Sequence, residues 1–392
     1  MKRSFFSMGL FLSLMGCGFG MKTQNEPAKI PFKIIGHDIV VTAKIDGFEN
    51  DFNLVVDTGG VALIDKKIAD ELELKQRGSM AKINVLNLSG YQIENVFCFT
   101  TFDFSLFKRM GIPIHGIIGS NLMERFKVTF DYLTNSLILS SDTSALIPRG
   151  DGIHFRFRNH PVNNAPIIQL KINGKEIEGM IDTGQPYPIA LPFKDFERFV
   201  KPSGTEAVRS KGLMIKWPQT DPRFNYLTCL KSLKLGNLRI AQAFCIAGEL
   251  PPMLSMPLIG TDLLSQFKMI INYPRDELML IPNPDIQLES NLYTLGLNLN
   301  LSEKGEVFVE GIWEGSPADK AGIQAGDVVT AFNEKRTAAE NLSELLKMMD
   351  DDRVESINLE ISNQNGTRKL ELNKEWLFRH HPGSDSNVTD LF

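Results

Sequence analysis

The tripeptide Asp-Thr-Gly occurs twice in this 392-residue chain, at residues 57–59 and 182–184, and both copies directly follow an apolar run. Each run is preceded by a second strand-like segment, with a turn sequence between the two. The turn is Asp46-Gly47 in the first copy and Asn173-Gly174 in the second. Dipeptides of this kind between two strand-like runs predict a β-hairpin. The chain therefore repeats a hairpin that ends in an acidic loop.

The similarity between the two halves continues downstream of each tripeptide. An apolar-apolar-Gly segment follows in both halves, as Ile117-Ile118-Gly119 and as Leu258-Ile259-Gly260, and each precedes a further apolar strand-like run. The two aspartates are 125 residues apart. An internal duplication of this kind predicts two similar units, and their strand-like patterns predict a mainly β fold.

Two aspartates on equivalent loops predict a pair of carboxyl groups that work together. Two carboxyl groups held close together cannot both ionise cheaply, so the pair shares one proton. The ionised member takes a proton from a water molecule, and the protonated member hydrogen-bonds a substrate carbonyl. Asp57 and Asp182 are therefore the predicted catalytic residues of an aspartic peptidase that needs no metal and no cofactor. The alternative is that each tripeptide is an ordinary polar turn after a strand.

At these residues the chain resembles the retropepsin-like aspartic proteases, in which each lobe supplies an Asp-Thr-Gly loop and a later apolar-apolar-Gly segment. The resemblance covers about residues 36 to 281. It implies two retropepsin-like or pepsin-like β-barrels that form one active site within a single chain. It also implies that Thr58 and Thr183 brace the two loops by hydrogen bonds, and that Gly59 and Gly184 permit the tight turn that presents each carboxyl.

The residue after each glycine departs from that family. Pepsin-type enzymes usually have Ser or Thr there and viral retropepsins often have Ala, whereas this chain has Gly60 and Gln185. Without a hydroxyl donor the ionised carboxylate loses a stabilising hydrogen bond, so we predict a pH optimum nearer neutral than that of a pepsin. Gln185 also leaves an alternative open, in which the second lobe has lost activity and the protein is a non-catalytic peptide-binding lipoprotein.

The two halves also differ in length. Gly119 lies 62 residues after Asp57, whereas Gly260 lies 78 residues after Asp182, so the second half has 16 extra residues in this interval. We expect much of the excess within residues 201–228, which contain Trp217 and Tyr226. In the family this interval holds the hairpin flap that closes over a bound peptide. The sequence fits both an enlarged aromatic lid and an inert surface insertion.

The last third of the chain has a different pattern. Residues 314–329 read Glu-Gly-Ser-Pro-Ala-Asp-Lys-Ala-Gly-Ile-Gln-Ala-Gly-Asp-Val-Val and resemble the core of a bacterial PDZ domain. The resemblance implies an α+β module that binds extended peptide chain ends by strand addition. It assigns peptide binding to Leu295, Gly296 and Leu297, in the loop that receives a carboxylate, and to Leu342, on the helix beside the groove. The alternative is a docking domain with an empty groove.

The N-terminus predicts where the protein is found. Lys2-Arg3 precedes an apolar run that is too short to span a bilayer as a mature helix. Leu14-Met15-Gly16-Cys17 resembles a bacterial lipobox, which implies lipidation of Cys17 and anchoring on the periplasmic or outer face of a cell-envelope membrane. The alternative is a plain signal peptide that contains a cysteine. We expect these boundaries: lipoprotein signal peptide 1–16, tether 17–35, lobe 1 36–142, linker 143–163, lobe 2 164–283, PDZ domain 288–374 and polar tail 375–392.

Composition restricts the partners. The net charge is −5 and there is no basic run, so nucleic acid is an unsuitable partner. The histidines show no His-Glu-x-x-His spacing, and no Gly-x-Ser-x-Gly motif or phosphate-binding loop is present. We therefore expect a polypeptide substrate, peptide C-termini at the PDZ domain, a membrane contact through the lipid anchor, and a monomer whose lobes pair within the chain.

Overall fold

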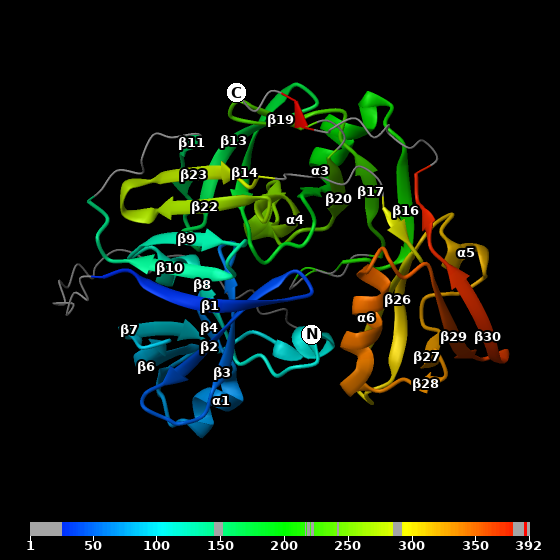
Figure 1. Ribbon diagram of the computed structural model, residues 1–392, viewed down its shortest axis with the longest axis horizontal. Coiled ribbons are helices and arrows are strands. Elements are labelled where there is room, and N and C mark those ends of the chain that lie inside the picture. The colour runs from blue at the N-terminus through cyan, green and yellow to red at the C-terminus, as the bar shows by residue number, and fades with distance from the viewer. Residues whose placement is uncertain are drawn as a thin grey trace, which may run out of the picture.

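The computed structural model of the protein describes residues 26–144, 152–215, 217, 220, 223–240, 243–284, 292–378 and 388–389. The predicted lipobox with Cys17 lies outside these residues. No helix within the described part of the chain is long and apolar enough to cross a membrane. The fold is mainly β, and Figure 1 shows two lobes on the left and top and a smaller C-terminal module on the right.

The first lobe begins with the hairpin predicted around Asp46-Gly47. Strands β2 and β3 pair antiparallel, and the turn residues have φ values of 47° and 80°. Both φ values are positive, so the chain turns at Asp46-Gly47 as predicted, although residues 46–51 form a longer loop between the two strands. The elements of this lobe are β1 (Ala28–Ile35), β2 (Asp38–Ile45), β3 (Phe52–Asp57), β4 (Leu63–Ile64), α1 (Lys66–Glu71), β5 (Lys75–Arg77), β6 (Met80–Leu88), β7 (Tyr91–Phe99), the 3-10 helix η1 (Phe104–Met110), β8 (Gly116–Gly119), α2 (Ser120–Met123), β9 (Lys127–Asp131) and β10 (Ser136–Ser140).

The second lobe repeats this plan. Its hairpin β13–β14 turns at Asn173 and Gly174, with φ values of 49° and 80°. The elements are β11 (Ile153–Arg156), β12 (Arg158–Asn159), β13 (Pro166–Ile172), β14 (Lys175–Ile181), β15 (Ile189–Pro192), α3 (Phe193–Asp195), the π-helix η2 (Phe196–Val200), η3 (Lys201–Ser203), β16 (Ala207–Gly212), β17 (Tyr226–Cys229), β18 (Leu233–Leu235), β19 (Leu238–Ile240), β20 (Phe244–Gly248), η4 (Pro252–Leu254), β21 (Leu258–Ile259), α4 (Thr261–Leu264), β22 (Phe267–Asn272), η5 (Tyr273–Arg275) and β23 (Glu277–Pro282).

Each apolar-apolar-Gly segment lies beside its own Asp-Thr-Gly loop. In the first lobe β8 runs parallel to β3, and Asp57 is opposite Gly119. In the second lobe β21 runs parallel to β14, and Ile181 is opposite Ile259. Glycine is required in these segments because the chain crosses at van der Waals distance: a Cβ on Gly119 would lie 2.2 Å from the Val61 carbonyl carbon.

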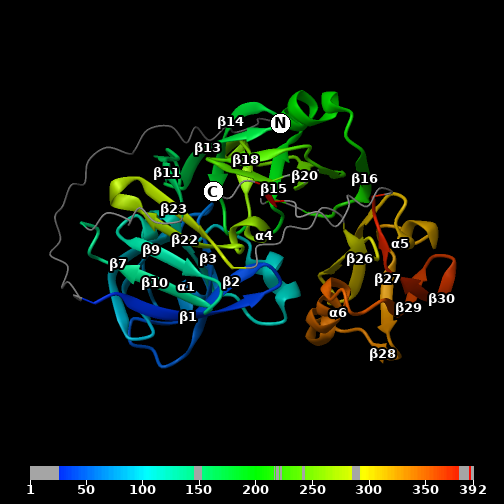
Figure 2. The same cartoon turned by 45° about the horizontal axis from the view of Figure 1, so that its top comes forward.

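One sheet joins the two lobes. Its strands run in the order β1, β10, β9, β22, β23, β11, so each lobe contributes half of it. Figure 2 shows β9, β10, β22 and β23 as one layer between the lobes. The apolar side chains that it buries include Phe130, Leu137 and Ile271, none of which is exposed. This shared sheet fixes the lobes relative to each other, and it places both acidic loops at their junction.

Three predicted boundaries need correction. Ala28–Ile35 was expected in the tether, but it forms β1, because Ile30 and Phe32 alternate with exposed residues and are buried against the lobe. The predicted linker 143–163 contains strands β11 and β12. They form because β11 pairs with β23 at the edge of the shared sheet and β12 pairs with β13. The predicted polar tail contains β31 (Glu375–Trp376) and β32 (Val388–Thr389), which pair with β24 and β19.

The C-terminal module folds around its own apolar core, which includes Leu299, Val309, Ile323, Val329 and Ile357. The buried alternation of these positions produces strands, and helix α6 covers the core with Leu342 and Leu345. The elements are β24 (Tyr293–Thr294), β25 (Leu297–Leu301), β26 (Val307–Trp313), α5 (Pro317–Lys320), β27 (Val328–Phe332), β28 (Lys335–Arg336), η6 (Ala339–Asn341), α6 (Leu342–Asp350), β29 (Ser356–Asn363), β30 (Gly366–Asn373) and β31.

Candidate active site

The two Asp-Thr-Gly loops meet and exchange hydrogen bonds through their threonines. The Thr58 amide donates to Thr183 Oγ1 and the Thr183 amide donates to Thr58 Oγ1, both at 3.0 Å. Each hydroxyl also donates across the junction at 2.9 Å, from Thr58 to the Ile181 carbonyl and from Thr183 to the Val56 carbonyl. Both threonines are fully buried. The loops are therefore held as one rigid, nearly symmetric unit.

The two carboxyl groups lie side by side within this unit. Each accepts a hydrogen bond from the glycine of its own loop: the Gly59 amide donates to Asp57 Oδ1 at 2.8 Å, and the Gly184 amide donates to Asp182 Oδ1 at 3.0 Å. Each also lies against the glycine of the other loop. A Cβ on Gly59 would meet Asp182 Cγ at 2.3 Å, and a Cβ on Gly184 would meet Asp57 Cγ at 2.7 Å.

The surroundings of the two loops raise the pKa of both carboxyl groups. Burial raises the pKa of Asp57, although hydrogen bonds from Asp182 and from the amides of Gly59, Gly60 and Gly184 act in the opposite direction. Burial, the charge of Asp57 and the hydrogen bond between the two carboxyls raise the pKa of Asp182 well above that of an ordinary aspartate. Both shifts favour a pair that holds one proton between its two carboxyls.

Two hydroxyl groups hydrogen-bond the main chain of the two loops, and the sequence did not predict this role for them. Ser120 Oγ donates to the Thr58 carbonyl at 2.7 Å, and Thr261 Oγ1 donates to the Thr183 carbonyl at 2.9 Å. Both residues directly follow an apolar-apolar-Gly segment, so the repeated hydroxyl position was the available signal. Ser120 also hydrogen-bonds the buried Tyr273 hydroxyl at 2.9 Å. The Asn163 side-chain amide, within the predicted linker, donates to the Gly59 carbonyl.

Gly60 and Gln185 stand at equivalent positions but have different surroundings. The Gly60 amide donates to the Asp57 main-chain carbonyl at 3.3 Å, and its closeness to the Asp57 carboxyl acts to lower the pKa of that group without any hydroxyl. A Cβ there would lie only 2.5 Å from Asp57 Oδ2. Gln185 is 1% exposed, and within the described residues neither its Oε1 nor its Nε2 has a hydrogen-bond partner. The first lobe thus has no room for a side chain, whereas the second lobe buries an amide.

The extra residues of the second lobe form the hairpin β16–β17. Its aromatic side chains pack inward: Trp217 is 6% exposed and lies over Gly248, while Tyr226 stacks on Phe196 with ring centroids 5.0 Å apart. Strand β16 pairs antiparallel with β26 of the C-terminal module, with Ser210 opposite Trp313. The insertion therefore connects the second lobe to that module, a role that the sequence did not indicate.

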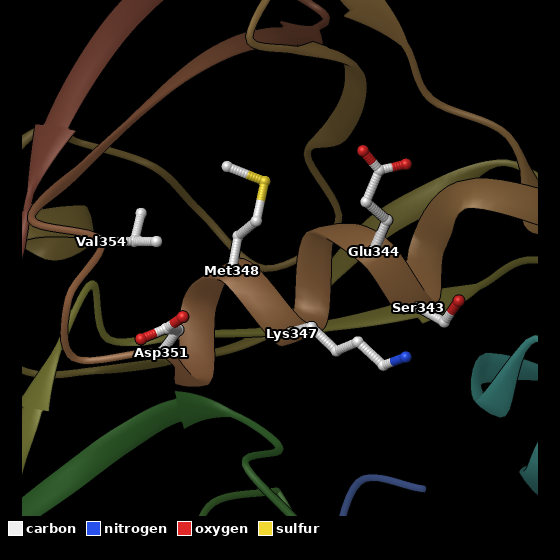
Figure 3. Close-up of a pocket in the computed structure, with 6 residues that line it drawn as sticks. All are labelled: Ser343, Glu344, Lys347, Met348, Asp351 and Val354. Atoms are coloured by element: carbon white, nitrogen blue, oxygen red, sulfur yellow. The ribbon is translucent and has the colours of Figure 1, made fainter.

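The predicted peptide-binding residues lie close together in the C-terminal module, but mostly inside it. Leu295, Leu297 and Leu342 belong to its apolar core and are 1%, 6% and 1% exposed. Gly296 has a φ of 80°, and a Cβ on it would collide with Ser316. A peptide-binding groove in this module would therefore be formed by the backbone of β25 and the surface of α6. The buried leucines lie beneath it. A hollow of about 300 Å³ lies along α6. Figure 3 shows the residues that line it, Ser343, Glu344, Lys347, Met348, Asp351 and Val354.

A polar junction that the sequence did not predict lies where all three parts meet. His37, in the turn between β1 and β2, hydrogen-bonds Asp262 of α4 through Nδ1 at 3.0 Å. Burial opposes protonation of His37, but the hydrogen bond to Asp262 and the charges of Asp262 and Asp350 raise its pKa. Burial also raises the pKa of Asp38 to about 6, and Asp38 senses the charges of both Arg109 and Asp57. The junction is thus electrostatically connected to the dyad.

Comparison with known proteins identifies one part of the chain. Residues 308–362 match the family described as PDZ domain, so the C-terminal module is a PDZ domain. No curated protein matches the sequence. Among solved structures, the chain is similar to the crystal structure of Basic 7S globulin from soybean, with 10% sequence identity and a TM-score of 0.38. That match covers 65% of this chain and 94% of the globulin chain, and it is too weak to bear on activity.

Proposed function

We propose that the protein is an aspartic endopeptidase of the retropepsin-like kind, in which Asp57 and Asp182 activate a water molecule against a peptide carbonyl. One observation carries this proposal: the two acidic loops interlock through the reciprocal Thr58 and Thr183 hydrogen bonds, and each presents its carboxyl against the glycine of the other loop. Two ordinary polar turns are not expected to exchange reciprocal hydrogen bonds with each other.

In the proposed reaction Asp57 is the general base. Its carboxylate removes a proton from the bound water, while Asp182 donates its proton to the carbonyl oxygen of the scissile bond. The resulting tetrahedral intermediate collapses when the amine leaves with a proton from the dyad. The hydrogen-bonded glycine amides hold both carboxyls in position, and the buried threonines prevent the loops from separating. No covalent intermediate is formed between enzyme and substrate.

We further propose that the protein acts at a membrane of the bacterial cell envelope, anchored by lipid on Cys17, and that the PDZ domain brings polypeptide chain ends to the lobes. PDZ domains bind extended chain ends by strand addition, which supports the choice of a polypeptide as substrate.

The test uses the full chain with Cys17→Ser, so that the protein stays in solution. The protein is incubated with a diverse peptide mixture from acid to neutral pH, beside Asp57→Asn and Asp182→Asn, and cleavage is followed by mass spectrometry. Cleavage by the parent and by neither variant is expected. Cleavage that persists in both variants, or that the parent lacks at every pH, contradicts the proposal. The second outcome favours a non-catalytic peptide-binding protein. The unpartnered Gln185 amide would then be the structural sign that the second lobe has lost activity.

A further inference from the structure

The PDZ domain touches both lobes, and the two contacts differ in kind. Strand β16 of the second lobe continues the sheet of the PDZ domain, whereas η1 of the first lobe rests against β25 and α6. Figures 1 and 2 show α6 on the side of the domain that faces the first lobe. The domain therefore bridges the lobes on the side away from their shared sheet.

The contact with the second lobe is extensive. The pairing of β16 with β26 continues into the loop, where the Leu213 amide donates to the Glu310 carbonyl at 2.9 Å. Lys211 forms an ion pair with Asp319 at 2.6 Å. An apolar cluster that includes Trp217, Trp313 and Phe378 is buried between the two parts. Backbone pairing together with a buried apolar core makes the PDZ domain and the second lobe one body.

The contact with the first lobe covers the peptide-binding face. Among the described residues β25 has strand pairing only with β26, so its other edge is where an added peptide strand would pair, between β25 and α6. Helix η1 lies against both of these walls. Gly111, just after η1, lies close to α6: a Cβ on it would lie 2.7 Å from Ser343 Oγ and 3.0 Å from Ser343 Cβ. Figure 3 shows Ser343 projecting from α6 toward the first lobe.

Charged side chains beside this contact are exposed, among them Arg109 in η1 and Asp350 at the end of α6. The His37 and Asp262 side chains of the inter-lobe ion pair are 49% and 39% exposed, and exposed pairs of this kind stabilise little. The charges of Arg109 and His37 act on Asp350 at the end of α6. This side of the junction is therefore the one that can open without unfolding either part.

We propose that η1 occupies the entrance of the PDZ groove in the resting protein, and that an extended polypeptide chain end displaces η1 from β25 and α6 when it binds. The movement is confined to η1 and the PDZ domain, since the shared sheet holds the two lobes together. A catalytic consequence rests on the proposed peptidase function, because displacing η1 changes a cleavage rate only if the dyad is active. The displacement itself does not depend on catalysis.

The displacement is tested with a reversible lock. In Gly111→Cys combined with Ser343→Cys, oxidation ties the loop after η1 to α6, and reduction releases it. Binding is measured by fluorescence anisotropy of a short labelled peptide pool that ends in apolar residues with free carboxylates. Oxidation is expected to weaken binding by about 5-fold to 150-fold, the range of ordinary allosteric coupling. Equal binding by the oxidised and reduced forms overturns the proposal.

A wedge variant gives the opposite change. Ser343→Trp places a large side chain against Gly111 and is expected to push η1 away and tighten peptide binding. Glu344→Trp is the matched control, because Glu344 is the next residue on α6 and projects from another side of the helix (Figure 3), where it pairs with Lys335. Tighter binding in Ser343→Trp alone supports the proposal. Unchanged or weaker binding, or no binding of the pool by any form, overturns it.

Cleavage in the same samples separates this proposal from the proposed activity. If both hold, the oxidised lock, which cannot receive chain ends, cleaves polypeptides slowly, and reduction restores the rate. Binding that responds to the lock without any cleavage leaves the displacement standing and contradicts the peptidase. Cleavage that requires both aspartates, with binding that ignores the lock, supports the peptidase and overturns the displacement.

Discussion

The two lobes share their acidic loops but differ in the hairpin that stands beside each loop. In the first lobe β5 and β6 pair through a tight turn, with Arg77 opposite Met80. In the second lobe the equivalent hairpin β16–β17 is much longer and pairs with the PDZ domain. The residues that converge on the dyad are thus duplicated, while those that face the third module have diverged.

The equivalence of the hairpins follows from strand pairing. The second strand of the short hairpin, β6, continues until it pairs with β2, where Lys44 is opposite Asn87. In the second lobe β18 pairs in the same way with β13, where Leu170 is opposite Leu235. Both hairpins therefore precede the same structural step, and variants of the two lobes can be compared position by position.

The largest effect is expected for Trp217→Ala in the long hairpin. Trp217 is 6% exposed and packs in the cluster between the second lobe and the PDZ domain, so its removal should cost about 3–5 kcal/mol of unfolding free energy. Urea unfolding measures this loss. The control is Trp376→Ala, whose side chain is 46% exposed. If both variants lose the same small amount, the long hairpin is not a firm attachment.

Removing either loop threonine should cost the same in both lobes. In Thr58→Val or Thr183→Val a buried amide and a buried carbonyl lose their partner, at about 1–3 kcal/mol for each group. Chemical denaturation of the two variants is compared with that of Thr42→Val, an exposed position in β2. A clear difference between the two loop variants would show that the junction is less symmetric than its hydrogen bonds.

Substitution of the residue that follows each Asp-Thr-Gly tripeptide should have different effects in the two lobes. Gly60→Ala brings a Cβ within 2.5 Å of Asp57 Oδ2, and the resulting shift of the carboxyl is expected to lower kcat about 10²-fold. Gln185→Met removes a buried amide that has no partner, so stability should hold or rise and cleavage should persist. Loss of cleavage in Gln185→Met would mean instead that this amide serves the reaction.

The smallest effect expected concerns the pH range of activity, which should lie nearer neutral than the pKa of an ordinary aspartate would place it. The proposed reaction requires one carboxyl of the pair, Asp57, to be ionised and the other, Asp182, to be protonated. It is therefore lost as the pH falls below the pKa of Asp57, which burial raises, and as the pH rises through the pKa of Asp182, which lies well above the usual value of about 3.9. Both limbs move toward neutral. The profile of kcat/KM against pH tests this, and a maximum below about pH 3 is incompatible with it.

The sequence predicted what is repeated and missed what joins unlike parts. The duplicated motif placed Asp57 and Asp182 on matching loops, because hairpin turns and apolar runs are local patterns. The pairing of β16 with β26 joins residues about 100 positions apart in unrelated modules, and no periodicity marks such a contact. His37 and Asp262 meet for the same reason only in the folded chain. Strand β1 lies within the predicted tether, although its alternating apolar residues indicate a strand.

The most direct test of the account is whether the two aspartates act as one unit. We measure kcat/KM for Asp57→Asn, Asp182→Asn and the double variant on a peptide that the parent cleaves. Each single substitution is expected to remove nearly all activity, and the double substitution is expected to remove no more, because a shared proton needs both carboxyls. Substantial activity in either single variant, or losses that multiply in the double variant, would contradict a single dyad.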